Sequence, residues 1–216
     1  MQRNRIIPIL TASLAAFAAT ASVASAASVI GTDSGERLVG TKTADSISAL
    51  GGNDRVFALN GADVVTAGEG NDLVVGGRGD DTLSGEAGND LLFANAGVDV
   101  LNGGDGNDRL WAVARVDVVA GEGGSVDKVG DTLNGGAGDD RLHARDGEVD
   151  VISCGDGIDA ANLDNVDVIS DATAEAPNGS CEKVNRAEPR RRDANTVNED
   201  LQQRVTDLLS RLRNKR

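Results

Sequence analysis

The feature that most constrains this fold is an aspartate that recurs every nine residues through the middle of the chain. An unbroken series at this spacing consists of Asp45, Asp54, Asp63, Asp72, Asp81, Asp90, Asp99, Asp108 and Asp117. After an insertion the series resumes, more loosely spaced, at Asp131, Asp140, Asp150, Asp159 and Asp167. An apolar residue usually stands two positions after the aspartate and a glycine two positions before it. A disordered acidic chain would not hold this pattern, so we expect a folded repeat.

Three residue roles convert the pattern into a structure. Glycine permits the positive φ values and the close backbone approach of a tight turn. The apolar residue lies in a short strand and points inward, while its neighbours along the strand point outward. One repeat is therefore a turn and a short strand. It cannot bury its apolar face alone, so the copies must stack.

A second period, twice as long, shows that alternate repeats differ. Three positions after every second aspartate stand Phe57, Val75, Phe93 and Trp111, whereas the intervening repeats have small or polar residues there. One coil is therefore about eighteen residues long and contains two turns and two strands, which belong to two facing sheets. We predict an all-β parallel β-roll with its aromatic residues on one sheet.

Stacking places the aspartates in columns at both edges of the roll. Because strands lie about 4.8 Å apart, the carboxylates of a column repel one another in a partly desolvated site. A hard divalent cation between successive turns removes this repulsion. Calcium accepts about six to eight oxygens in flexible geometry, whereas magnesium demands tighter octahedra and zinc favours histidine and cysteine. We therefore predict several bound Ca²⁺ ions.

The repeats resemble the RTX, or haemolysin-type, calcium-binding nonapeptide, Gly-Gly-x-Gly-x-Asp-x-apolar-x. Residues 76–84, 103–111 and 135–143 match every fixed position, and 68–72 and 87–90 are near matches. The resemblance implies a parallel β-roll with calcium between same-edge turns one coil apart. It implies carboxylate ligands from Asp54, Asp72, Asp90 and Asp108 at one edge, from Asp63, Asp81 and Asp99 at the other, and from Asp140. It also implies backbone carbonyl ligands from turn residues such as Gly68, Gly70, Gly77, Gly79, Gly104 and Gly106.

Several copies depart from the RTX pattern. The turn at Asp117 has an arginine in place of its glycine, so a full site is not expected there. The turns at Asp63 and Asp99 keep one glycine and predict weaker sites. The turns at Asp45 and Asp150 lack that glycine, and we expect them to be structural turns.

Composition divides the chain into four segments. Residues 1–26 have a basic start, an apolar stretch and a small-residue cleavage site, as in a secretory signal peptide. Residues 27–170 form the predicted β-roll, from which an insertion at 122–128 should bulge. We expect 171–192 to be irregular and to end in a basic linker. Residues 193–216 have the apolar spacing of a short amphipathic C-terminal α-helix, which could dock on the roll, on a membrane surface or on a partner.

Cys154 and Cys181 are the only two cysteines. An even count in an exported chain indicates a disulfide. This bond would clip the segment 162–180 onto the last coil and stabilise the fold by about 3 kcal/mol in the chain-entropy model. We expect a secreted, extracellular protein with no transmembrane segment in its mature chain.

Charge and residue usage narrow the function. The net charge of −14 leaves no clustered basic face for nucleic acid. His143 is the single histidine and the chain has no phosphate-binding loop, so we do not expect an enzyme. We expect a structural or binding module whose folding is coupled to calcium. The alternatives are a cell-surface or polysaccharide adhesion module and an accessory subunit of a carbohydrate-active enzyme.

Overall fold

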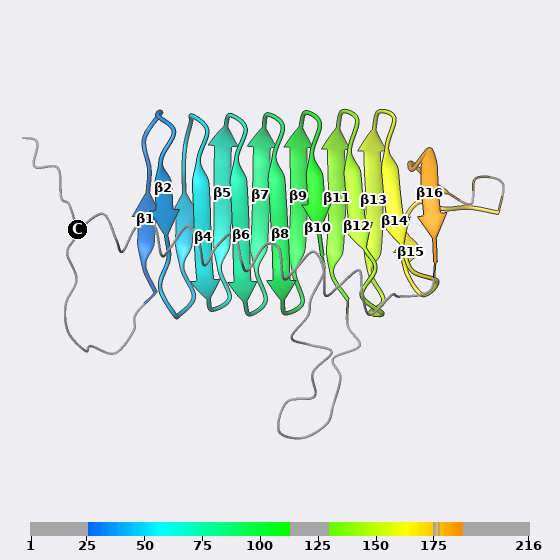
Figure 1. The fold of residues 1–216 in the computed structure, drawn as a ribbon, viewed down its shortest axis with the longest axis horizontal. Helices are drawn as coiled ribbons and strands as arrows, with labels where there is room; N and C mark the ends of the chain where they lie inside the picture. Colours follow the sequence, from blue (N-terminus) through cyan, green and yellow to red (C-terminus); the bar gives the residue numbers. More distant parts are fainter. Residues whose placement is uncertain (1–25, 113–129, 175, 177, 188–216) are drawn as a thin grey trace, which may run out of the picture.

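The structure, a computed structural model, describes residues 26–112, 130–174, 176 and 178–187. All regular elements in this part of the chain are β-strands, which form two parallel sheets of eight strands each (Figure 1). We call them the odd sheet and the even sheet after the numbers of their strands. The chain passes from one sheet to the other and back, so each coil adds one strand to each sheet. The predicted all-β parallel roll is confirmed.

The strands follow one another in each sheet in chain order. The odd sheet contains β1 (Ser28–Ile30), β3 (Ser46–Ser48), β5 (Val64–Glu69), β7 (Thr82–Ala87), β9 (Val100–Asp105), β11 (Thr132–Ala137), β13 (Val151–Asp156) and β15 (Val168–Ile169). The even sheet contains β2 (Arg37–Val39), β4 (Arg55–Asn60), β6 (Leu73–Arg78), β8 (Leu91–Ala96), β10 (Arg109–Trp111), β12 (Arg141–Ala144), β14 (Ala160–Leu163) and β16 (Lys183–Arg186). Leu73 of β6 lies opposite Leu91 of β8, one predicted coil length further along the chain.

The core is a single thin layer of aliphatic side chains between the two sheets. Each stands two positions after a repeat aspartate and is at most 1% exposed: Ile47, Val56, Val65, Val74, Leu83, Leu92, Leu101, Leu110, Leu133, Leu142 and Ile152. Two positions further along the strand, a buried alanine such as Ala67 or Ala94 often faces the same core. The burial of each large aliphatic side chain contributes about 1.5–3 kcal/mol. The alternation of inward and outward residues that the sequence predicts therefore builds the core.

Turn glycines let successive coils approach more closely than a side chain permits. Gly88 has a φ of +139°, and a Cβ there would stand 1.7 Å from the carbonyl oxygen of Gly70, one coil earlier. Gly51, in contrast, has no such φ, and a Cβ there would have its closest neighbour at 3.6 Å. The two glycines therefore differ in what an added methyl group would do.

We expect Gly88→Ala to destabilise the roll by at least about 2 kcal/mol, because the new Cβ combines backbone strain with a steric clash. Gly51→Ala is the matched control and should change the stability by less than about 1 kcal/mol. Thermal unfolding in saturating calcium measures both effects. Equal losses in the two variants would contradict this account of the turn.

The offset between paired strands is longer where the pairing spans residues 113–129, which lie outside the described part of the chain. Leu101 of β9 pairs with Leu133 of β11, an offset of 32 residues, where the preceding coils have 18. Asp131 therefore follows Asp99 directly at one edge, in the place that the period assigns to Asp117. Asp117 itself and the insertion at 122–128 lie outside the described residues.

The roll extends further toward the C-terminus than the sequence analysis predicts. The segment 171–192, predicted to be irregular, contains β16, which pairs in parallel with β14. Val184 of β16 packs against the core, and Asp159 donates its backbone N–H to the carboxylate of Glu182 at 2.7 Å. Glu182 and Val184 thus repeat the acid-x-apolar pattern with glutamate in place of aspartate, which is why the period did not reveal this strand.

The predicted disulfide between Cys154 and Cys181 is confirmed, with the two Cα atoms 5.2 Å apart. Cys154 lies in β13 and Cys181 lies two residues before β16, and both are almost completely buried. The bond therefore fixes the final strand to the coil before it.

Two predicted segments lie outside the part of the chain that the structure describes: the signal peptide, apart from its residue 26, and the C-terminal helix at 193–216. Within the described ranges, no helix has the length and hydropathy needed to cross a membrane.

The outer face of the even sheet carries the predicted row of aromatic residues. Paired strands place Phe57, Val75, Phe93, Trp111 and His143 side by side. The ring of Trp111 stacks on that of His143 with a centroid separation of 3.7 Å, and Arg37 lies 5.0 Å from the centre of the Phe57 ring. Phe57 and Val75 are at most 9% exposed. The row is therefore less open to solvent than an outward strand position predicts.

Candidate metal centres in the turns

The repeat aspartates lie inside the turns, where they are no more than 5% exposed. The first column, at the edge where the even strands begin, contains Asp54, Asp72, Asp90, Asp108, Asp140 and Asp159. The second column, at the edge where the odd strands begin, contains Asp45, Asp63, Asp81, Asp99, Asp131, Asp150 and Asp167. All eight aspartates that the sequence analysis names as ligands belong to these columns. Their role as ligands stays a prediction.

One oxygen of each carboxylate, Oδ1, accepts a backbone hydrogen bond from the preceding coil. Oδ1 of Asp72 accepts a hydrogen bond from the backbone N–H of Asp54 at 2.7 Å, and Oδ1 of Asp90 accepts from Asp72 at 2.8 Å. The same bond crosses the insertion, because Asp99 donates its N–H to Oδ1 of Asp131 at 2.8 Å. Each carboxylate is therefore held against the coil that precedes it.

The other oxygen, Oδ2, is buried and has no hydrogen-bond partner in the described part of the chain at most of these positions. The residues concerned are Asp54, Asp63, Asp72, Asp81, Asp90, Asp108, Asp131, Asp140, Asp150 and Asp159. A buried anionic oxygen without a donor or cation is costly. A whole column of such oxygens therefore points to a ligand that neutralises them.

In the turns that have glycine at the first position, such as that of Asp90, Oδ2 faces this glycine. A Cβ at Gly85 would stand 2.3 Å from Oδ2 of Asp90 and 2.6 Å from the carbonyl oxygen of Gly103, one coil further along. The missing side chain thus leaves a space that carboxylate and carbonyl oxygens line. Calcium binds such mixed oxygen sets, so the residues fit this ion.

The six glycines predicted to supply carbonyl ligands lie in the same turns as the columns, all with positive φ: Gly68, Gly70, Gly77, Gly79, Gly104 and Gly106. The Gly70 carbonyl oxygen, for example, lies against Gly88 of the next coil. Ligation by these carbonyls stays a prediction. The structure adds carbonyls at the first turn position, such as that of Gly103, which sequence reasoning missed.

Burial raises the pKa of several carboxyls in the columns. The pKa of Asp81 rises to about 8, because burial removes water and because the charges of Asp99 and Asp63 are near. Burial and neighbouring carboxylates raise the pKa of Asp90 to about 7 and that of Asp131 to about 10. Without a cation, closing these turns near neutral pH either buries repelling charges or requires carboxyls that are ionised in the unfolded chain to take up protons, and both cost free energy. A divalent cation would keep them ionised.

An asparagine ladder, which the sequence analysis missed, runs beside the first column. Asn71 donates its backbone N–H to Oδ1 of Asn53 at 2.8 Å, and Asn89 donates to Asn71 at 2.7 Å. Asn107 and Asp139 continue the ladder. Its bonds run opposite to those of the aspartates, so each first-column turn is joined to both neighbouring coils. The signal was present in the sequence, as asparagine precedes four successive first-column aspartates.

Two parallel sheets joined by buried acidic turns at both edges define a parallel β-solenoid with candidate cation sites along its length. The chain belongs to the family described as RTX calcium-binding nonapeptide repeat. The family matches residues 30–65, 57–92, 66–101, 75–110, 93–125 and 130–159, which together are more than half of the chain. Neither the comparison with curated proteins nor that with solved structures found a match.

Family membership confirms the resemblance that the repeats indicate. RTX repeats imply calcium binding, and in a β-solenoid they fit a calcium-binding structural module. The repeats and the disulfide are also consistent with an extracellular location.

Proposed function

We propose that this chain is a secreted structural or binding module whose roll closes when calcium ions bind between successive turns. The observation that carries the proposal is the row of buried Oδ2 atoms that have no hydrogen-bond partner among the described residues. Calcium supplies the positive charge that they lack, so ion binding and folding become one equilibrium. Affinities of the extracellular kind, about 10⁻⁴–10⁻³ M, are sufficient for this role.

The coupling gives the chain two states in two environments. At low calcium, closing the turns would require the buried carboxyls to repel one another or to take up protons, so the chain stays open. At millimolar calcium outside a cell, the ions draw the turns together and the roll forms. The disulfide and the predicted signal peptide support a route through an oxidising compartment.

The proposed ligands are the eight aspartates predicted from the sequence, together with Asp131 and Asp159. In both of them Oδ2 is buried and has no hydrogen-bond partner within residues 26–112, 130–174, 176 and 178–187. Turn carbonyls complete the coordination, both from the six predicted glycines and from the first turn position. Each ion then lies between carboxylates of two coils.

Catalysis is not part of the proposal. His143, the single histidine, stacks on Trp111, and burial lowers its pKa to about 4, with the charges of Arg145 and Arg141 adding to the effect. A neutral, stacked imidazole of this kind is a weak base at neutral pH.

Asp81→Asn tests the proposal, with Asp80→Asn as the matched control. Both variants lose one negative charge in the same turn, but Asp81 is 1% exposed with an unpartnered Oδ2, whereas Asp80 is exposed. Asp80 accepts a hydrogen bond from the N–H of Val98 at 3.0 Å, and an asparagine keeps that acceptor.

Isothermal titration calorimetry with calcium should show at least one ion fewer, or about tenfold weaker binding, for Asp81→Asn. Asp80→Asn should bind like the unmodified chain. Magnesium should give little heat at the same concentrations. Identical titrations of the two variants, or equal responses to the two metals, would contradict the proposal.

A further inference from the structure

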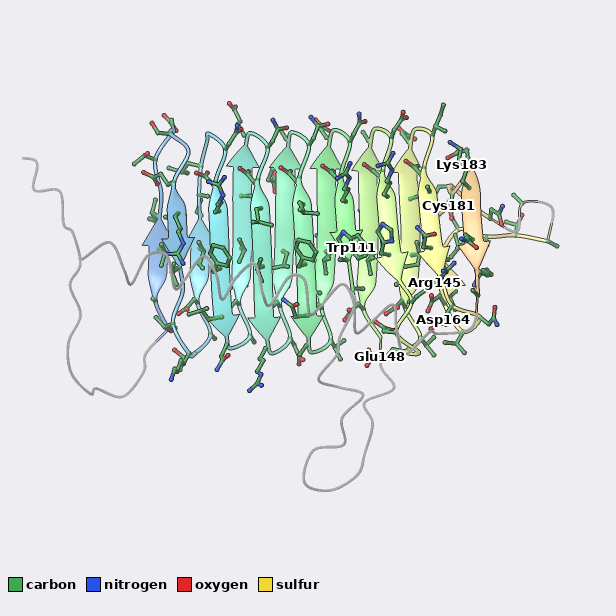
Figure 2. All side chains as sticks on the ribbon, viewed as in Figure 1. Trp111, Arg145, Glu148, Asp164, Cys181 and Lys183 are labelled. Carbon is green, nitrogen blue, oxygen red and sulfur yellow. A yellow bond between two sulfur atoms is a disulfide. The ribbon has the colours of Figure 1, made fainter. Side chains whose placement is uncertain are left out.

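Three carboxylates converge in a turn that departs from the repeat. Asp146, Glu148 and Asp150 each place one oxygen within 4.8 Å of the others, and all three side chains are buried. Asp146 and Glu148 stand at the second and fourth turn positions, where the RTX repeat has glycine. Figure 2 shows Glu148 at the lower edge of the roll, toward its C-terminal end.

Neighbouring coils bring further acids to the same place in the second column. Oδ1 of Asp150 accepts the N–H of Asp131 at 2.6 Å, and Oδ1 of Asp167 accepts the N–H of Asp150 at 3.3 Å. The charge of Asp146 contributes to the raised pKa of both Asp131 and Asp167. Negative charge is therefore more concentrated here than in a repeat turn, where glycines stand beside the column.

Two carboxylate oxygens, one in this turn and one in the turn of the preceding coil, lack a partner in the described part of the chain, which is an observation independent of the clustering. Oδ2 of Asp150 and Oδ2 of Asp131 are buried with no hydrogen bond to any described residue, and both side chains are 0% exposed. At this end of the roll, the guanidinium groups of Arg145 and Arg186 donate to backbone carbonyl oxygens. A cation held by the carboxylates would satisfy the two oxygens.

We propose that Asp146, Glu148 and Asp150 form a divalent-cation site of a second kind, in which side-chain carboxylates replace the glycines of a repeat turn. The choice of calcium as its ion rests on the proposed function. Because calcium affinity rises with the number of charged ligands, this site fills at a calcium concentration roughly tenfold below that which the repeat turns need. The structure thus gives a ligand role to a turn that the sequence analysis expects to be structural only.

The test uses the full chain with Glu148→Gln and, separately, Asp146→Asn, both of which keep the side-chain shape. Asp156→Asn is the control, because Asp156 is an exposed acid in the following turn. Circular dichroism at 10 mM calcium, about ten times the concentration that extracellular sites need, checks that each variant folds. The two site variants test the same ion independently if one of them does not fold.

Equilibrium dialysis across calcium concentrations should resolve one tightly bound ion from the weaker ions of the repeat turns. We expect each site variant to lose the tight ion, or to bind it at least about tenfold more weakly, and to keep the weaker ones. Asp156→Asn should keep both classes.

A tight ion that persists in both site variants would overturn this proposal and leave the repeat sites intact. The same conclusion would follow if the unmodified chain bound only weak ions, as would occur if a basic side chain of the chain neutralised the cluster. Loss of the weak ions alone in Asp81→Asn, with the tight ion retained, would support two separate kinds of site.

Discussion

Removal of calcium at pH 8 is expected to abolish the β-sheet signal of this chain in far-ultraviolet circular dichroism. Both edges of the roll then carry buried carboxylates whose Oδ2 atoms have no cation and no hydrogen-bond donor from the part of the chain that the structure describes. The free energy of unfolding of a small fold is only about 5–15 kcal/mol. The free-energy cost of several uncompensated buried charges is larger than this. Added calcium should restore the signal cooperatively, with a midpoint of about 10⁻⁴–10⁻³ M.

Two controls separate calcium binding from general screening of charge. Sodium chloride at matched ionic strength weakens repulsion between exposed charges but cannot coordinate buried oxygens. Magnesium has the right charge but dehydrates reluctantly and demands tighter geometry. Neither should restore the fold. A full β signal in chelator at pH 8 would contradict coupled folding, although the β-solenoid architecture would stand.

Acid is expected to replace calcium in part, so the metal-free chain should be more folded at pH 5 than at pH 9. An aspartate in the unfolded chain titrates near pH 4, whereas burial raises the pKa of Asp81 to about 8 and that of Asp131 to about 10. Between these limits the folded state holds protons that the unfolded chain has released. Stability without metal therefore falls as the pH rises, by at most about 1.4 kcal/mol per pH unit for each such carboxyl.

Calcium should reverse this dependence, because bound ions need ionised carboxylates and protons compete with them. Thermal unfolding across this pH range, in buffers freed of calcium by a chelating resin and in saturating calcium, measures both trends. Metal-free stability that increases with pH would contradict the raised pKa values. So would a calcium affinity that does not weaken as the pH falls.

The fold could be predicted because the sequence has two clear periods, of nine and of eighteen residues. The nine-residue spacing of aspartate fixes the turn and strand, and the alternation of Phe57, Val75, Phe93 and Trp111 with small or polar residues fixes the coil. Pairing of these four residues side by side confirms that reasoning. Periodicity suffices here because each coil contacts mainly its two neighbours.

Prediction failed where the period breaks. Spacing alone cannot show that Asp131 takes the place after Asp99, because the two residues are 32 positions apart and the nine-residue period assigns that place to Asp117. The strand β16 was missed because Glu182 substitutes for aspartate in its turn. The site residues could be named from the repeat. Which carboxylate oxygen accepts the backbone hydrogen bond and which one is left for a cation depends on side-chain rotamers that only the folded turn determines.

The alternation of the two edges also determines how many residues can be added to the repeat region without disturbing the two sheets. An added stretch equal to one complete coil would keep every downstream strand on its own sheet, with the asparagine ladder still beside the first column. A single nonapeptide added upstream of Trp111 would shift every later strand to the other sheet. Trp111 would then lie on the odd sheet, and the two aspartate columns would change edges from that point on. A duplication that preserves this architecture must therefore add nonapeptides in pairs.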